Sequence, residues 1–206
     1  MPKSDITISS NNRKIKNANI WNLPVGTTCK PGVSCSEYCY AKKAEKAYPE
    51  VRPCRMRNYA ASKKDNFSSE MIKILSKKKY HVTRIHESGD FYSVEYIRKW
   101  YDIAKALPSH AFYAYTKRDD IFTIEVLSEK PKNLTIIYSV DGIRTIEDSV
   151  IITHVALENG FDKVAIVTEH DTNCPSTSKD KWAVACVKDC QKCFSGNTNI
   201  INFARH

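Results

Sequence analysis

Between residues 80 and 168 short apolar runs alternate with longer amphipathic stretches, and this alternation constrains the fold more than any other feature. The apolar runs predict strands, at residues 80–85, 111–115, 134–140 and 163–167. The stretches with a helical period predict helices, at residues 94–107, 120–128 and 147–158. Ser93 is the expected N-cap of the first of these helices. Strands that alternate with helices in this way are typical of βαβ units and predict a parallel sheet.

Further apolar runs extend this pattern to both ends of the chain. They predict a first strand at residues 16–23, a helix within residues 57–78 and a last strand at residues 198–203. About six strands favour an α/β fold built as a partial (β/α)6, TIM-like barrel of parallel strands. A closed eight-unit barrel usually needs ~250 residues, whereas this chain has 206. A doubly wound open sheet is the alternative, and in both architectures chemistry takes place at the carboxyl ends of the strands.

The domain organisation follows from the same pattern. Residues 1–15 are polar and predict a flexible arm, and residues 16–206 predict a single domain in which residues 174–195 form a Cys-rich, metal-binding insertion. The mean hydropathy is −0.46, and no apolar run approaches the roughly 20 residues of a membrane-spanning helix. No apolar stretch at the N-terminus resembles a secretory signal. We therefore expect a cytoplasmic protein with no membrane partner.

Basic residues are concentrated at the start of the chain. The whole sequence has 32 Lys and Arg against 23 Asp and Glu, a formal net charge of +9. Residues 1–80 hold 17 of these basic residues and only 6 of the acidic ones, a local excess of +11. This excess predicts a nucleic acid or another polyanion as partner. A solvated, lysine-rich surface is the alternative interpretation.

The eight cysteines fall largely into two clusters, and clustered thiols in a chain without a secretory signal more often bind metal than form disulfides. The first cluster comprises Cys29, Cys35 and Cys39, in the loop after the first predicted strand. Three thiolates on a short loop can hold three irons of a [4Fe–4S] cluster and leave the fourth iron open for a small molecule. A zinc ion would need a fourth ligand, which Cys54 or a histidine could supply.

The second cluster provides four thiols after the strand predicted at residues 163–167. Its members are Cys174, Cys186, Cys190 and Cys193. Four thiolates complete either a closed zinc site or a second [4Fe–4S] cluster, and the spacing alone does not discriminate between the two metals.

Polar residues gather where the predicted strands end. Asp90 is the main catalytic candidate, as a base, a nucleophile or a ligand of an ammonium group, and its alternative role is the N-cap of the following helix. His86 is the second catalytic candidate, and its alternative role is a hydrogen-bonded group in the core. The remaining cofactor-binding candidates are Ser88, Gly89, Lys117, Ser139 and Glu169. Lys117 could bind a carboxylate or a phosphate, and Glu169 could bind ribose hydroxyls or transfer protons.

Five segments resemble the phage gene product 88 family over most of residues 20–195. They read CKPGVSCSEYCYA, PEVRPCRMRN, RIHESGDFYSVEYIRKW, FYAYTKR and CVKDCQKCF. More distantly, the chain resembles the radical SAM superfamily, whose members bind S-adenosylmethionine (SAM) at a [4Fe–4S] cluster inside a partial barrel. That resemblance makes the cysteines of the first cluster the ligands, Tyr38 the aromatic residue beside the cluster, and Ser88-Gly89-Asp90 the counterpart of the motif that binds the methionine amino group.

The resemblance implies a radical SAM-like iron–sulfur enzyme, acting in the host cytoplasm. Such an enzyme cleaves SAM reductively for radical chemistry and needs an electron donor as partner, and the basic charge suggests a nucleic acid or nucleotide substrate. A zinc-containing barrel that exchanges nucleobases, with Asp90 as nucleophile, is a different class of enzyme with the same residues. A metal-stapled nucleic-acid-binding module without catalytic activity is the third hypothesis.

Overall fold

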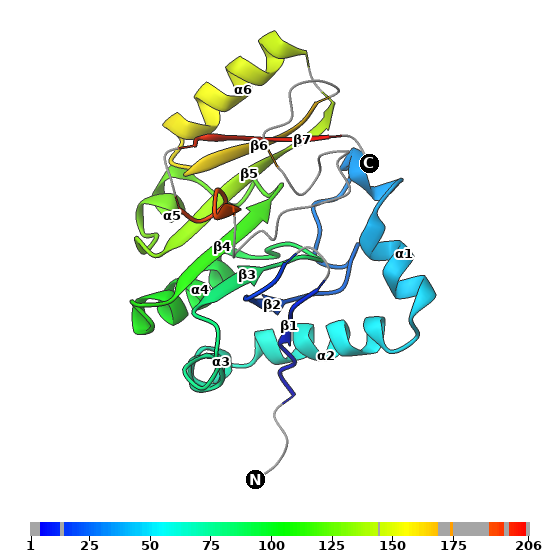
Figure 1. The fold of residues 1–206 in the computed structure, drawn as a ribbon, viewed down its shortest axis with the longest axis vertical. Helices are drawn as coiled ribbons and strands as arrows, with labels where there is room; N and C mark the ends of the chain where they lie inside the picture. Colours follow the sequence, from blue (N-terminus) through cyan, green and yellow to red (C-terminus); the bar gives the residue numbers. More distant parts are fainter. Residues whose placement is uncertain are drawn as a thin grey trace.

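The strands form one open, seven-stranded sheet in the order of the chain (Figure 1). A computed structural model describes residues 5–12, 15–143, 145–168, 174, 190–195 and 198–204. The strands are β1 Ser9–Ser10, β2 Asn19–Trp21, β3 Val82–Ile85, β4 Ala111–Thr116, β5 Leu134–Ile143, β6 Lys163–Thr168 and β7 Ile200–Ala204. The six strands β2–β7 are all parallel, and only the short β1 pairs antiparallel to its neighbour.

This arrangement confirms the α/β class and the parallel sheet. A doubly wound sheet reverses its strand order part-way through, whereas here every strand pairs with the next one along the chain. The sheet is not closed into a barrel, because β1 and β7 are its two edges. The sequential strand order shows that the alternative of a doubly wound sheet is wrong, and the two free edges show that the sheet is not a closed TIM barrel.

The helices agree with those expected, except that the first helix was not predicted and the helix expected within residues 57–78 is two helices. They are α1 Tyr40–Ala47, α2 Val51–Lys63, α3 Phe67–Leu75, α4 Val94–Ala106, α5 Ile124–Ser128 and α6 Ile146–Glu158, preceded by the 3-10 turn η1 Ser34–Ser36. Ser93 caps α4 as expected, since its side chain accepts a hydrogen bond from the backbone N–H of Tyr96. Among the described residues, no helix has the length and apolar character needed to cross a membrane.

The helix expected within residues 57–78 is two helices. Lys64 is extended, with φ −68° and ψ 148°, and ends α2, so α3 starts afresh at Phe67. Pro53 is accommodated inside α2 because it lies in the first turn, where a backbone N–H has no partner within the helix. The break turns α3 to place Phe67 against Trp21 and Trp100, with ring centroids 5.5 and 5.9 Å apart.

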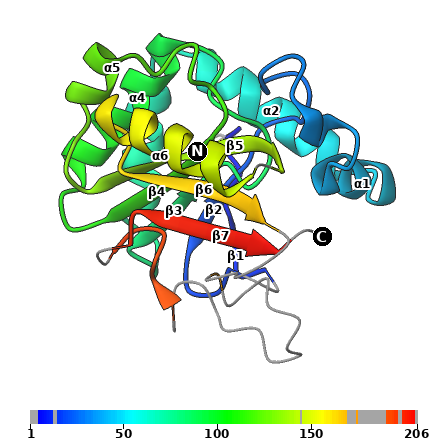
Figure 2. The same ribbon diagram turned by 90° about the horizontal axis from the view of Figure 1, so that it is seen from above.

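The two faces of the sheet differ in what packs against them. Helices α4, α5 and α6 lie on one side, whereas residues 190–195 lie on the other (Figure 2). Ile85, Phe112 and Ile136 point into the large core beneath the helices. The opposite face, which we call the second face, carries Tyr113, Ile137, Ala165 and Ile201, and Cys174 and Phe194 pack on it.

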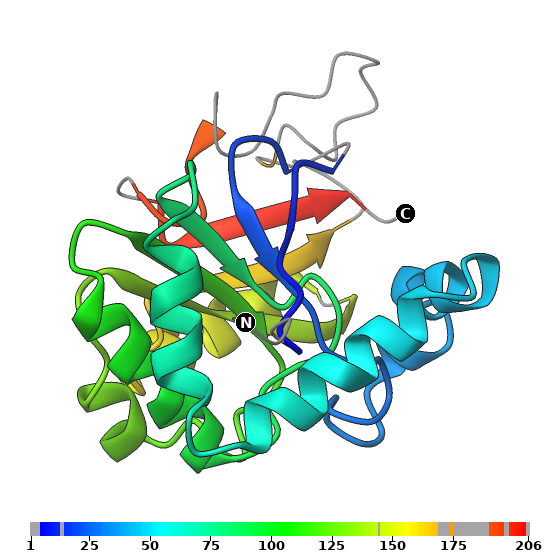
Figure 3. The ribbon, with the colours of Figure 1, turned by 90° about the horizontal axis from the view of Figure 1, so that it is seen from below.

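Part of the segment expected as an arm is packed on the domain. Ile6 and Ile15 are buried, and β1 extends the sheet at its edge (Figure 3). Asn58 of α2 accepts a hydrogen bond of 2.8 Å from the Thr7 backbone N–H and donates one of 2.9 Å to the Thr7 carbonyl. This segment is polar in composition but packs on the domain, because Asn58 of α2 satisfies the backbone of Thr7 and two isoleucines are buried.

Candidate functional site

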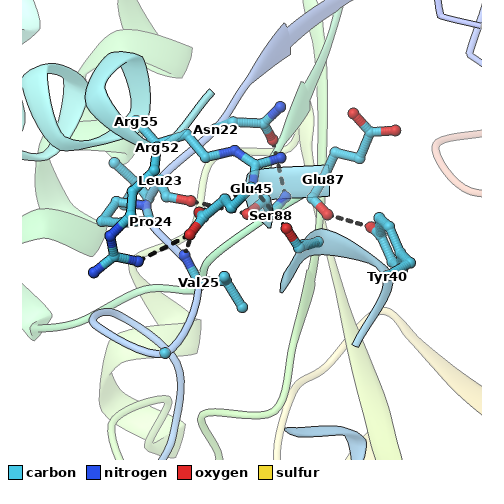
Figure 4. Close-up of polar contacts among 12 residues, drawn as sticks. Asn22, Leu23, Pro24, Val25, Tyr40, Glu45, Arg52, Arg55, Glu87 and Ser88 are labelled. Atoms are coloured by element: carbon cyan, nitrogen blue, oxygen red, sulfur yellow. Dashed lines mark hydrogen bonds and ion pairs between the residues drawn. The ribbon is translucent and has the colours of Figure 1, made fainter. Parts of the chain in front are cut away.

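The loop that carries the first cysteine cluster is hydrogen-bonded to the turn after β3. Ser88 donates from its hydroxyl to the Leu23 carbonyl at 3.0 Å, and the Ser88 carbonyl accepts from the Leu23 N–H at 3.0 Å. The Ser88 N–H donates to the side chain of Asn22 at 2.9 Å (Figure 4). Ser88, expected to bind a cofactor, is therefore buried and holds the start of the cysteine loop in place.

Gly89 lets this turn approach the cysteine loop closely. Its φ is +78°, and a Cβ at this position would lie 2.6 Å from the hydroxyl oxygen of Thr28 and 2.7 Å from the Cβ of Leu23. The next residue continues the contact, because the Asp90 N–H donates to the Thr28 hydroxyl at 3.2 Å. Both glycine properties, a left-handed backbone and the missing side chain, are used here.

Asp90 connects the ends of β3 and β4. Its carboxylate accepts hydrogen bonds from the Thr116 hydroxyl at 2.7 Å, the Lys117 N–H at 2.9 Å and the Phe91 N–H at 2.8 Å. Burial raises the pKa of Asp90 to about 6 in spite of these donors. Asp90 is not the N-cap of α4, because Ser93 has that role. Its structural role is instead to link the turn after β3 to the end of β4 by hydrogen bonds.

Lys117 lies between the ends of β4 and β5. Its ammonium donates to the carbonyls of Ser139 and Val140 at 3.1 and 3.0 Å and lies 3.5 Å from the Asp141 carboxylate. Asp141 in turn accepts from the backbone N–H of Ser34 at 2.7 Å, which brings the middle of the cysteine loop to the end of β5. The expected cofactor residues Lys117 and Ser139 are thus neighbours.

Cys29 and Cys35 of the first cluster interact electrostatically with each other, with Cys39 and with the groups at the strand ends. Burial, together with the charges of Asp90, Cys39 and Cys35, raises the pKa of Cys29 to about 11. Burial also raises the pKa of Cys35, which the Lys117 ammonium lowers in part. The sequence separated these residues by up to 88 positions, and the fold brings them to the same end of the sheet.

No group of three or more His, Cys, Asp or Glu side chains within the described residues converges on a single metal ion. Each of the seven cysteines in this part of the chain is a free thiol. Cys174 is buried, its N–H donating to the Asn202 carbonyl at 3.1 Å, and the Cys193 sulfur lies 2.9 Å from the Tyr115 hydroxyl. Cys186 and Glu169, which the sequence also singled out, lie outside the described residues.

Two further candidates, Tyr38 and His86, differ in burial: Tyr38 is exposed and His86 is buried. Tyr38 is 57% exposed at the edge of the loop, whereas Tyr40 turns back to donate a hydrogen bond to the Glu87 carbonyl (Figure 4). His86 has a left-handed backbone, with φ +61°, and its buried ring lies 4.6 Å from that of Phe91 in the helix-side core. Burial lowers the pKa of His86 to about 3, so the ring is neutral.

Two features of the site had no clear signal in the sequence. Glu45 of α1 accepts from Arg52 at 2.9 Å, from Arg55 at 3.0 Å and from the Val25 N–H at 3.2 Å, which fixes the first residues of the cysteine loop (Figure 4). Both arginines belong to the basic first third of the chain, and both are paired with Glu45. The second feature is Arg84 on β3, which lies on the second face of the sheet beside Tyr113.

Comparison with known proteins places the chain in a family. The family model described as Gene product 88 matches residues 4–199. The chain belongs to the gene product 88 family. It is similar to a Gene 88 protein of Mycobacterium phage L5, with 27% identity over 232 aligned positions that cover 93% of this chain and 95% of the relative. A Gene 88 protein of Mycobacterium phage D29 is 29% identical over 160 positions, covering 64% of this chain and 66% of the relative.

These matches confirm the expected resemblance between this gene product 88 protein and phage proteins. No solved structure matches the chain. None of the matches relates the gene product 88 family to radical SAM enzymes, so that more distant resemblance stays a prediction.

Proposed function

We propose that this gene product 88 protein is an iron–sulfur enzyme of the radical SAM type. One observation carries the proposal: Cys29 and Cys35 of a single loop interact electrostatically with Cys39 and with Asp90, and Cys35 also with Lys117, at the carboxyl ends of parallel strands. Six parallel strands in sequential order are also the strand arrangement of a partial (β/α)6 barrel. Chemistry in such sheets is located at this end of the strands.

The donor set fits a cluster better than a single ion. A zinc ion draws four ligands into one tetrahedron, and the described residues provide no such convergence. In a [4Fe–4S] cluster each thiolate binds a different iron, so its ligands lie further apart. Burial keeps Cys29 protonated, which makes a bound cation the natural means of forming its thiolate.

The chain's own residues then take distinct roles. Cys29, Cys35 and Cys39 would hold a [4Fe–4S] cluster, which when bound supplies an electron for reductive cleavage of SAM. Lys117 offers a cation, supported by Ser139, for the carboxylate of the methionine part. Asp90 holds the backbone of Lys117 in place and offers the remaining capacity of its carboxylate to an ammonium group.

The late cysteines provide a second site in this proposal. Cys174, Cys186, Cys190 and Cys193 would hold either a second cluster or zinc. The basic first third of the chain favours a nucleic acid or nucleotide as substrate. A zinc-containing nucleobase transglycosylase ranks second, because its nucleophile would be Asp90, whose carboxylate already accepts three hydrogen bonds.

Anaerobic purification followed by iron, sulfide and zinc analysis tests the proposal. We expect a brown protein with about four irons per occupied cluster. We also expect the protein to bind SAM, as measured by calorimetry. Cys35→Ala should lose the first cluster and SAM binding, whereas Cys54→Ala should retain both. Cys54 is the matched control because it is also a half-exposed thiol, but on α2. Colourless protein with stoichiometric zinc and no iron would overturn the proposal.

A further inference from the structure

Arg84 projects from the middle of the second face of the sheet. It is in register with Tyr113 of β4, while its neighbour Ile85 points to the helix-side core. The centre of its guanidinium lies 4.6 Å from the ring centroid of Tyr115 and 5.7 Å from that of Tyr113. The residue is therefore a cation beside two aromatic rings on this sheet face.

This cation has no anionic partner in the part of the chain that the structure describes. Its Nε is fully buried and lacks a hydrogen bond. The other arginines with largely buried side chains are satisfied, since Arg55 pairs with Glu45 and Arg118 with Asp120. A buried charge without a partner is costly, and contact with aromatic rings compensates for it only in part because it leaves the Nε–H without an acceptor.

The groups around Arg84 are the rings and hydroxyls of two tyrosines and the thiol of Cys193. The Tyr115 hydroxyl lies 2.9 Å from the Cys193 sulfur. Phe194 lies against Tyr113 with ring centroids 5.5 Å apart. A guanidinium whose Nε–H lacks an acceptor is suited to a planar or tetrahedral oxyanion, which it can bind through two parallel hydrogen bonds.

We propose that Arg84, together with Tyr113 and Tyr115, binds the oxyanion group of a ligand, a carboxylate or a phosphate, on the second face of the sheet. Tyr40, which follows Cys39, and Cys193 both act electrostatically on the Arg84 guanidinium. The ligand is an anion whose charged end reaches into the domain. This site does not depend on the first cluster, since none of its residues is a proposed ligand of that cluster.

Stability measurements separate a ligand-binding role from a structural role. If Arg84 is kept for a ligand, Arg84→Met removes an unpaired charge, and the melting temperature without added anion stays the same or rises. If Arg84 is held by a structural ion pair, Arg84→Met lowers the melting temperature by several degrees or prevents folding, and the proposal is overturned. Arg98→Met is the control, because Arg98 pairs with Glu129 at the exposed surface.

Binding measurements identify the anion. Inorganic phosphate, adenosine monophosphate and glutarate are titrated separately into wild-type protein, and the melting temperature and calorimetric Kd are recorded. We expect saturable binding by the phosphate probes or by the carboxylate probe, which distinguishes the two sources. Arg84→Lys should raise Kd at least tenfold because it loses the paired donors, Arg84→Met should abolish binding, and Arg98→Met should leave it unchanged.

Cys35→Ala should bind the same anion with an unchanged Kd, which separates this site from the first cluster. Absence of binding by all three probes, or equal binding by wild type and Arg84→Met, would refute the anion site whatever the iron content.

Discussion

The carboxylate of Asp90, in the turn after β3, accepts a hydrogen bond of 2.9 Å from the backbone N–H of Lys117, the first residue after β4. The same carboxylate accepts from the hydroxyl of Thr116, the last residue of β4. These two bonds fix the backbone from which the Lys117 side chain reaches the end of β5. An acidic residue at this position therefore organises the neighbouring strand end as well as facing the cysteine loop.

Asp90→Ala should destabilise the protein by ~2–4 kcal/mol, because the buried Thr116 hydroxyl and the Lys117 N–H lose their acceptor. Chemical denaturation at pH 7 measures the change. Asp5→Ala is the matched control: its ion pair with Lys64 lies at the exposed surface, so its loss should change the stability much less than the loss of Asp90 does. Equal effects of the two substitutions would contradict the role assigned to Asp90.

Gly89→Ala should destabilise the protein by more than ~2 kcal/mol. The new Cβ would collide with Thr28 and Leu23, and the backbone has φ +78°. Gly26→Ala has the same φ of +78° but meets nothing within 4 Å, so its cost should be limited to the ~1 kcal/mol of the backbone effect. Thermal unfolding of the two variants side by side isolates the contact between the turn and the cysteine loop.

Arg55→Met and Arg52→Met should differ although both arginines bind Glu45. Arg55 has 10% of its side chain exposed and Arg52 has 53%. Loss of the buried partner should cost ~2–4 kcal/mol, and loss of the exposed one about 1 kcal/mol or less. Denaturant titrations give both values, and a larger cost for Arg52→Met would refute this account of the α1–α2 contact.

His86 should make the protein sensitive to acid. Its folded-state pKa of about 3 lies below its unfolded value, so the unfolded chain binds the extra proton, and stability falls as pH drops from 6.5 towards 3. The loss from this group should reach about 2 kcal/mol between pH 7 and pH 5. His86→Asn keeps a residue that tolerates a positive φ and should remove this component of the pH dependence, measured by urea titrations at several pH values.

Asp90 should contribute with the opposite sign. Its folded-state pKa of about 6 is raised, so the folded chain takes up the proton first, and this group stabilises the fold below pH 4 and loses that contribution as pH rises to 6. Wild type should therefore gain stability relative to Asp90→Asn as pH falls from 6 to 4. A difference between the two proteins that does not change with pH would show that Asp90 titrates normally.

Local elements were largely predictable from the sequence. The apolar runs identified β2–β7, and the period of the intervening stretches identified α4–α6 with the Ser93 cap. Helix α1 was not predicted because YAKKAEKA has few apolar residues. Its position instead depends on Glu45, which binds two arginines of α2. The spacing of Cys29, Cys35 and Cys39 indicated a cofactor loop, and the fold places that loop beside Asp90 and Lys117.

The sequence by itself determined most of the strands and helices, since these depend on side-chain period and capping over a few residues. Only the tertiary structure decided what each polar side chain binds. Arg55 and Arg84 are both arginines in apolar surroundings, yet one has a carboxylate partner and the other has none among the described residues. The reason is physical: such a partner is set by strand register and helix packing, which bring together atoms that are distant along the chain.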